Sequence, residues 1–209
     1  MITQRYLYPV HPTRAQIYTN LEQTMTDFTL YTATDAPTEE GRSLLANSIK
    51  KFGMIPGLHA VMVEAPGLLK AYNVVGDLFT DSSLDADEVT VVWQTVNVEH
   101  DCHYCVPAHT AIAKGMGVGD EINDALRNET PLPNARLEAL RDFTLSVVRN
   151  RGHVDDAGVQ AFLDAGFSKR QILEVVLGVA QKVMSNYTNH LADTPVDAPF
   201  QKFDWQKAA

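Results

Sequence analysis

The sequence predicts an all-α protein, a single-domain multi-helical bundle of about eight helices, and three observations favour this fold class. Apolar residues recur at helical spacing, as in Leu137, Leu140, Phe143 and Val147, which follow one stripe of the run 134–149. Proline and glycine stand mostly at the boundaries between such runs. A chain of 209 residues, 45% of them hydrophobic, is long enough to bury a proper core.

The predicted elements follow one another with short connections. An extended arm at 9–12 precedes a helix over 14–28, and a polar stretch separates that helix from another over 40–51. Glycine and proline at 53–57 indicate a turn. Further helices are expected at 58–64, 67–79, 102–116, 120–128, 134–149, 155–164 and 169–191, followed by an extended tail from Pro195.

Capping residues predict where several of these helices begin. Pro66 is favourable as the first residue of its helix, and Asp101 is a reasonable N-cap for the helix that starts at Cys102. Ser168 and Gln171 form a capping box that opens the long helix 169–191. The segment 88–98 is different, because its β-branched residues give it the local propensity of a strand.

Composition excludes several classes of partner. The net charge is −9 and no basic stripe is present, which disfavours nucleic acid and anionic membranes as partners. The N-terminus lacks the basic and apolar regions of a signal peptide, and no apolar run approaches the length of a membrane span. We therefore expect a cytoplasmic protein that binds neither nucleic acid nor membranes.

Both cysteines of the chain lie in one Cys-x-x-Cys, Cys102 and Cys105, with His109 four residues after the second. In a reducing compartment this spacing indicates redox chemistry or metal binding more than a structural disulfide. On a helix that begins at Cys102, all three side chains fall within a sector of about 60°. The helix N-terminus favours the thiolate, and His109 is placed to exchange a proton with Cys105.

The neighbouring polar residues admit functional and structural interpretations. Glu99 precedes the cysteines by one turn and can orient His109 or accept a proton. His103 is a solvated or contact residue or part of a proton relay, and Tyr104 either packs or lines the site. The late polar cluster of the last helix forms hydrogen bonds at the helix end or supports the thiols; its members are Asn186, Tyr187, Asn189 and His190.

The segment around the two cysteines resembles the alkylhydroperoxidase D-like and carboxymuconolactone decarboxylase superfamily. The resemblance rests on Val91–Gly115, including Cys102-His103-Tyr104-Cys105-Val106-Pro107-Ala108-His109, and on flanking segments at 52–57, 65–72, 164–167, 171–176 and 189–193. It covers roughly 40–195 and leaves an N-terminal extension with a helix, 1–39, and a C-terminal tail, 196–209. It implies an all-helical fold that assembles into homo-oligomers, and it implies that 88–98 is a helix.

The resemblance also implies roles for individual residues. Cys105 would attack the hydroperoxide, Cys102 would resolve the product as a disulfide, and His109 would relay protons; an analogy with thioredoxin would reverse the two cysteines. Peroxidases of the family carry a glutamate about twelve residues before the first cysteine, where this chain has Thr90. Glu88 is two residues from position 90 and would point in another direction on a helix. We therefore expect Glu99 to take over the role of the family glutamate.

The resulting hypothesis is a thiol-dependent peroxidase that reduces hydrogen peroxide or organic hydroperoxides. A dithiol protein or small dithiol would regenerate the enzyme, and the reaction needs no bound cofactor or metal. One alternative is a disulfide oxidoreductase or redox sensor without efficient peroxidase activity. The other is a metal-binding or structural oligomeric module, although zinc usually takes four ligands and only two thiols are available.

Overall fold

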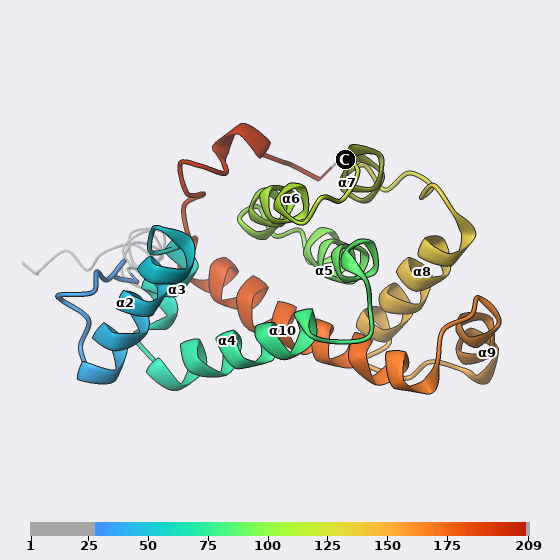
Figure 1. Ribbon diagram of the computed structural model, residues 1–209, viewed down its shortest axis with the longest axis horizontal. Coiled ribbons are helices and arrows are strands. Elements are labelled where there is room, and N and C mark those ends of the chain that lie inside the picture. The colour runs from blue at the N-terminus through green and yellow to red at the C-terminus, as the bar shows by residue number, and fades with distance from the viewer. Residues whose placement is uncertain (1–27, 208–209) are drawn as a thin grey trace, which may run out of the picture.

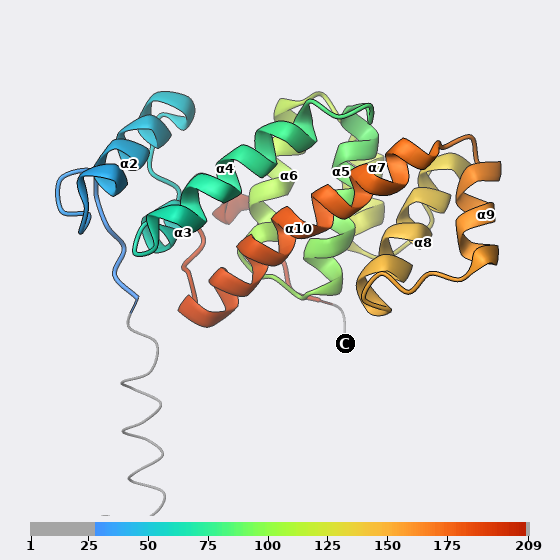
Figure 2. The same cartoon turned by 90° about the horizontal axis from the view of Figure 1, so that it is seen from below.

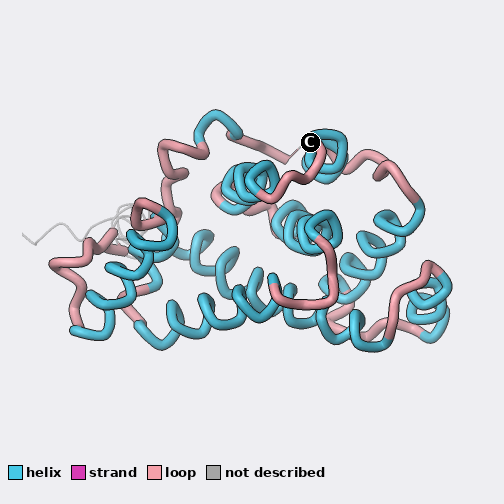
Figure 3. The backbone as a smooth tube through the Cα atoms, in the orientation of Figure 1, coloured by secondary structure: helices cyan, strands magenta, loops and turns pink. Residues whose placement is uncertain are grey.

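The computed structural model describes residues 28–207, and this part of the chain is all-α without any strand (Figures 1 and 3). The predicted fold class is therefore confirmed. The arm at 9–12 and nearly all of the helix predicted over 14–28 lie outside the described residues. The helices are α2 (Glu39–Phe52), α3 (Gly57–Met62), α4 (Pro66–Thr80), α5 (Ala86–Glu99), α6 (Cys105–Gly115), α7 (Asp120–Arg127), α8 (Ala135–Arg149), α9 (Asp156–Asp164), α10 (Lys169–Ala192) and the 3₁₀ turn η1 (Gln201–Phe203).

The strand-like segment 88–98 is a helix, α5, as the resemblance implies. Every residue from Glu88 to Val98 is buried, because α5 packs against α6, α7, α8 and α10 in the middle of the bundle (Figure 1). A helix covered on all sides needs apolar residues on all sides, which valine supplies. Burial outweighs a strand propensity that spans only about 1 kcal/mol. A capping box of Asp85 and Glu88 fixes the start of α5.

The long helix α10 begins at the predicted capping box of Ser168 and Gln171 and runs beside α4 (Figure 2). Gly178 permits this close approach, since a Cβ atom there would lie 2.7 Å from the ring of Phe79 and 2.8 Å from Val92. Both neighbours are buried and have little room to move. None of the described helices is long and apolar enough to cross a membrane.

The buried apolar residues form two clusters. The larger cluster joins α5 to α7, α8, α9 and α10, while the smaller joins α2, α3 and the start of α4 to Cys102 and Cys105. The tail after α10 turns back over α6, where Arg127 donates a hydrogen bond to the carbonyl of Phe203 at 3.0 Å (Figure 1). The tail was predicted to be extended, but η1 interrupts it.

Candidate active site

The first cysteine lies just before α6 rather than inside it. Asp101 has a left-handed φ of 53°, whereas an N-cap is normally extended, so the prediction that Asp101 caps the helix is wrong. Helix α6 begins at Cys105, and its N-cap is Tyr104, whose side chain makes no capping hydrogen bond. The sulfur of Cys102 accepts from the N–H of Cys105 at 3.4 Å, and its carbonyl accepts from the N–H of Val106 at 3.1 Å. Pro107 is tolerated because the first-turn N–H groups need no helical partner.

Cys105 is the thiol that lines a pocket. The amide of Asn189 donates to its sulfur at 3.2 Å. Burial alone would raise the pKa of Cys105, but the Cys102 thiol, the charge of Lys182, and the amides of Asn186 and Asn189 outweigh it and lower the pKa to about 6. At neutral pH Cys105 is therefore mainly a thiolate, the reactive form.

Cys102 has the opposite environment. Its side chain is fully buried, and it is absent from the lining of the pocket. Its hydrogen bond to the Cys105 sulfur, together with burial, raises the pKa of Cys102 well above its usual range. Both thiols are free. The two neighbouring cysteines are thus a protonated buried thiol and a thiolate that faces the pocket.

His109 is paired with a buried lysine. The Nζ atom of Lys182 lies 2.5 Å from Nε2 of His109, and both side chains are buried. Burial and the charge of Lys182 hold the pKa of His109 well below its usual value, so the ring is neutral. An ammonium only donates, so Nε2 accepts and the ring proton lies on Nδ1. This Nδ1–H has no hydrogen-bond partner within residues 28–207.

Within residues 28–207, no carboxylate pairs with the buried ammonium of Lys182. Burial lowers the pKa of Lys182 to about 8, although the sulfurs of Cys105 and Cys102 act in the opposite direction. Its Nζ lies 5.7 Å from the ring centre of Trp93, and the indole N–H of Trp93 donates to Gln181 at 2.7 Å. Among the described residues, the thiolate of Cys105 is therefore the negative group that balances Lys182.

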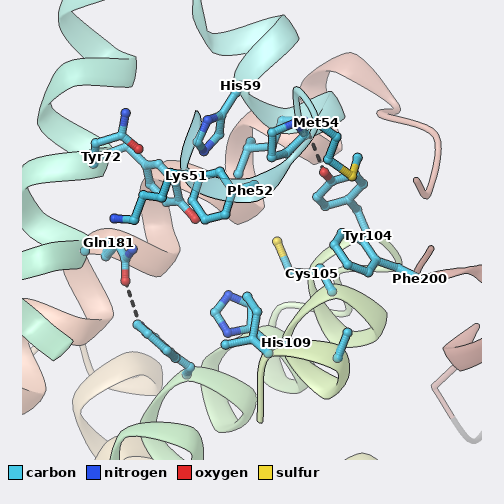
Figure 4. Close-up of a pocket in the computed structure, with 18 of the residues that line it drawn as sticks. Lys51, Phe52, Met54, His59, Tyr72, Tyr104, Cys105, His109, Gln181 and Phe200 are labelled. Atoms are coloured by element: carbon cyan, nitrogen blue, oxygen red, sulfur yellow. Dashed lines mark hydrogen bonds between the residues drawn. The ribbon is translucent and has the colours of Figure 1, made fainter. Parts of the chain in front are cut away.

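The pocket has a volume of about 560 Å³, within the range of about 300–1,000 Å³ found for small-molecule sites. Cys105 and His109 project into it from α6, one helical turn apart (Figure 4). Lys51 and Asp77, an ion pair with both side chains more than half exposed, also line it. Most of the remaining wall is apolar and aromatic, including Phe52, Leu58, Tyr72, Trp93, Ile112 and Phe200.

The acidic residues predicted for the site lie elsewhere. Glu99 is bound at both carboxylate oxygens by Arg149, at 2.8 and 2.7 Å, so it does not orient His109 as expected. Glu88 caps α5 and binds Arg136 at 2.8 Å. Thr90 is buried, and its hydroxyl has no partner in the described part of the chain. Where the sequence predicted a carboxylate beside His109, the structure has a lysine.

Tyr104 and His103 hold the tail against the site. The hydroxyl of Tyr104 donates to Asp197 at 2.6 Å and accepts from the N–H of Leu58 at 3.2 Å, and Tyr104 also lines the pocket. Both interpretations offered for this residue, packing and lining, therefore hold. His103 is half-exposed and contacts the carbonyl of Thr194 at 3.1 Å, away from the thiols.

The sequence analysis missed Lys182 and undervalued the two asparagines. Lys182, Asn186 and Asn189 follow one another at spacings of four and three residues, which places them on one face of α10. Asn186 also donates to Asn97 at 2.9 Å, and so supports the turn that carries the cysteines. The polar face in an otherwise buried helix was the available signal, because buried polar groups need partners.

Comparison with known proteins agrees with this fold. Residues 66–141 match the carboxymuconolactone decarboxylase family, and no curated protein sequence matches the chain. A peroxidase-related protein with an alkylhydroperoxidase AhpD core from Ralstonia eutropha JMP134 has a similar structure, with a TM-score of 0.75 and 20% identity over 84% of this chain and 94% of that one. These findings confirm the resemblance to the alkylhydroperoxidase D-like and carboxymuconolactone decarboxylase superfamily.

Two further solved structures have the same fold. A peroxidase-related protein from Silicibacter sp. TM1040 gives a TM-score of 0.69 at 19% identity, over 85% of this chain and 96% of that one. The debrominase Bmp8, in complex with 2,3,4-tribromopyrrole, gives a TM-score of 0.71 at 16% identity, over 86% of this chain and 96% of that one. Within residues 28–207, no three His, Cys, Asp or Glu side chains lie together as a metal site would require.

Proposed function

We propose that this protein is a thiol-dependent peroxidase in which Cys105 attacks the hydroperoxide. The observation that carries the proposal is that Cys105, whose pKa is lowered to about 6, lines the same pocket as neutral His109, whose Nδ1–H has no partner within residues 28–207. A thiolate beside a proton donor is what cleavage of an O–O bond requires.

In the first step the Cys105 thiolate attacks the terminal oxygen of the hydroperoxide. An S–O bond forms, the O–O bond breaks, and the leaving alkoxide takes the Nδ1 proton of His109. Lys182 returns a proton to the ring through Nε2, where its Nζ lies 2.5 Å away. The products are an alcohol and the sulfenic acid of Cys105, so sulfur is oxidised by two electrons and the peroxide is reduced by two.

In the second step Cys102 resolves the sulfenic acid. The S–S bond forms, the S–O bond breaks, and the thiol proton of Cys102 leaves with the hydroxyl group as water. The sulfur of Cys102 is close enough to accept from the N–H of Cys105, which supports this role. An external dithiol then reduces the disulfide by exchange, and Lys182 regains its proton when the Cys105 thiolate re-forms.

The assay is consumption of hydrogen peroxide and of an organic hydroperoxide with dithiothreitol as reductant. Cys105→Ser should abolish turnover, while Cys102→Ser should stop after one equivalent and leave a sulfenic acid that dimedone traps. Undiminished turnover by Cys105→Ser would overturn the proposal. A protein that fails to consume peroxide, yet exchanges its disulfide rapidly with protein thiols, would be the disulfide oxidoreductase of the alternative hypothesis.

Homo-oligomer formation and a cytoplasmic location stay predictions. Sedimentation velocity of the reduced protein tests the first, and a single boundary at the monomer mass would contradict it. Fractionation of the native host tests the second.

A further inference from the structure

A histidine on the far wall of the pocket has a free hydrogen-bond acceptor. His59 lies in α3 and is only 4% exposed. Its Nδ1 is 2.8 Å from the hydroxyl of Ser48, whose single proton goes to the carbonyl of Leu44 at 3.1 Å. We assign this proton to the carbonyl, which can only accept, and Nδ1 is then the donor to Ser48. The second ring nitrogen, Nε2, is then the unprotonated one.

No group in the described residues donates to this Nε2 atom. The ring is fixed in place, since it meets Phe52 and Tyr72 edge-on at centroid distances of 5.6 and 5.8 Å. Burial, and then the charge of Lys51, lower the pKa of His59 to about 4, so the ring stays neutral at physiological pH. His59 lines the pocket, and its Nε2 is not among the sealed, unpaired polar atoms of the interior, so this nitrogen is open to a ligand that donates a hydrogen bond.

The position of His59 relative to the thiol defines the two ends of the pocket. His59 projects from α3, whereas Cys105 and His109 project from α6 on the other side (Figure 4). Aromatic side chains such as Tyr72 and Trp93 form the walls between them. A molecule that occupies this space contacts several aromatic rings as well as aliphatic groups, and the rings favour flat apolar groups.

We propose that the pocket selects an aromatic substrate that donates a hydrogen bond from a hydroxyl or N–H group to Nε2 of His59 and presents its reactive end to Cys105. This inference rests on the proposed function for its reactive end, and His59 acts as a positioning residue that sets specificity. Hydrogen peroxide is too small to reach Cys105 and His59 at the same time, so it would be a poorer substrate than an aromatic hydroperoxide.

Binding is tested without turnover, by calorimetry on the Cys105→Ser protein with two probes. The probe 2-naphthol carries a donor, and 2-methoxynaphthalene has the same rings without one. We expect 2-naphthol to bind about tenfold more tightly, the difference made by one buried hydrogen bond. His59→Phe should remove this preference, and His59→Gln, whose amide oxygen can accept near the Nε2 position, should restore part of it.

The outcomes separate this inference from the proposed function. Equal affinity for the two probes, or no binding of either, would overturn the inference even if His59→Phe does not fold. A preference that His59→Phe abolishes supports it, and it would do so even if the wild-type protein consumed no hydroperoxide. In that case the peroxidase proposal alone would fail, and a reductive reaction on halogenated aromatic compounds would be the next to assay.

Discussion

Two buried or partly buried basic residues contact the segment 99–109, and their surroundings differ sharply. Arg149 is half-exposed and donates to both oxygens of Glu99, an ion pair that is complete in itself. Lys182 is fully buried against His109, without a carboxylate among the described residues that contact it. The first pair neutralises two charges beside water, whereas the second keeps a charge where water is excluded.

This difference supports the roles proposed for Lys182 and His109. The hydrogen bonds from Arg149 lower the pKa of Glu99, which fixes the carboxylate in its ordinary charged form. Burial lowers the pKa of both Lys182 and His109, which brings the lysine close to the pH at which it can give up a proton. Strong perturbation by burial beside a nucleophile is typical of catalytic sites. Sequence distance is misleading here, because Glu99, three residues before Cys102, is held by Arg149, whereas Lys182, distant in the sequence, contacts His109.

Lys182→Met is expected to have the largest effect. The variant removes the charge that favours the Cys105 thiolate and the group that reprotonates His109. The loss of thiolate at pH 7 costs about tenfold and the loss of proton transfer about a hundredfold, so kcat/KM should fall about a thousandfold. Peroxide kinetics measure the rate, and the ultraviolet absorbance of the thiolate measures the pKa of Cys105 in a Cys102→Ser background.

The fold of this variant should survive. Without the lysine charge Cys105 is protonated at neutral pH, so the variant leaves no unpaired charge buried, and a methionine of similar length fills the space. Thermal unfolding followed by circular dichroism provides the control. A folded Lys182→Met protein with wild-type kinetics and an unchanged Cys105 pKa would remove the functional distinction between the two basic residues.

His109→Gln should have a smaller effect than Lys182→Met. The glutamine amide can still donate a hydrogen bond but cannot transfer a proton, while Lys182 remains to favour the thiolate. The value of kcat/KM should therefore fall about a hundredfold, and the pKa of Cys105 should change little. The loss should be greatest for hydroperoxides with poor leaving groups, because these depend most on protonation. Equal losses across a series of leaving groups would contradict a proton-donor role.

The pH dependence of kcat/KM should be bell-shaped. The Cys105 thiolate is present above its pKa of about 6, so the rate rises through that value; the Lys182 ammonium is present below its pKa of about 8, so the rate falls beyond it. Each limb should change the rate about tenfold per pH unit. In Lys182→Met the alkaline limb should disappear, and its persistence would assign that limb to another group.

Helical periodicity and capping were sufficient to predict most of the fold, as the Ser168 box and the stripe of α8 illustrate. Local propensity failed for α5, where burial on every side outweighs β-branching. The site was harder to predict. Spacing brought Cys105 and His109 together, but only the packing of α10 brings Lys182 to His109, and only the placement of α3 puts His59 on the wall of the same pocket.

Glu99→Gln should have the smallest effect of all, and it is the matched control for the lysine variant. Because Arg149 is half-exposed and the pair is screened by water and salt, its contribution to stability should be below about 1 kcal/mol. The lowered pKa of Glu99 means that this contribution is present above the unfolded pKa, near 4.5, and is lost as the pH falls through the folded value. Chemical unfolding of wild type and variant should therefore differ slightly at pH 7 and converge in acid.

The peroxidase rate of Glu99→Gln should change less than twofold, because Glu99 touches neither His109 nor the pocket. A loss approaching that of His109→Gln would return Glu99 to the proton relay and make the pair with Arg149 a resting state of a catalytic carboxylate.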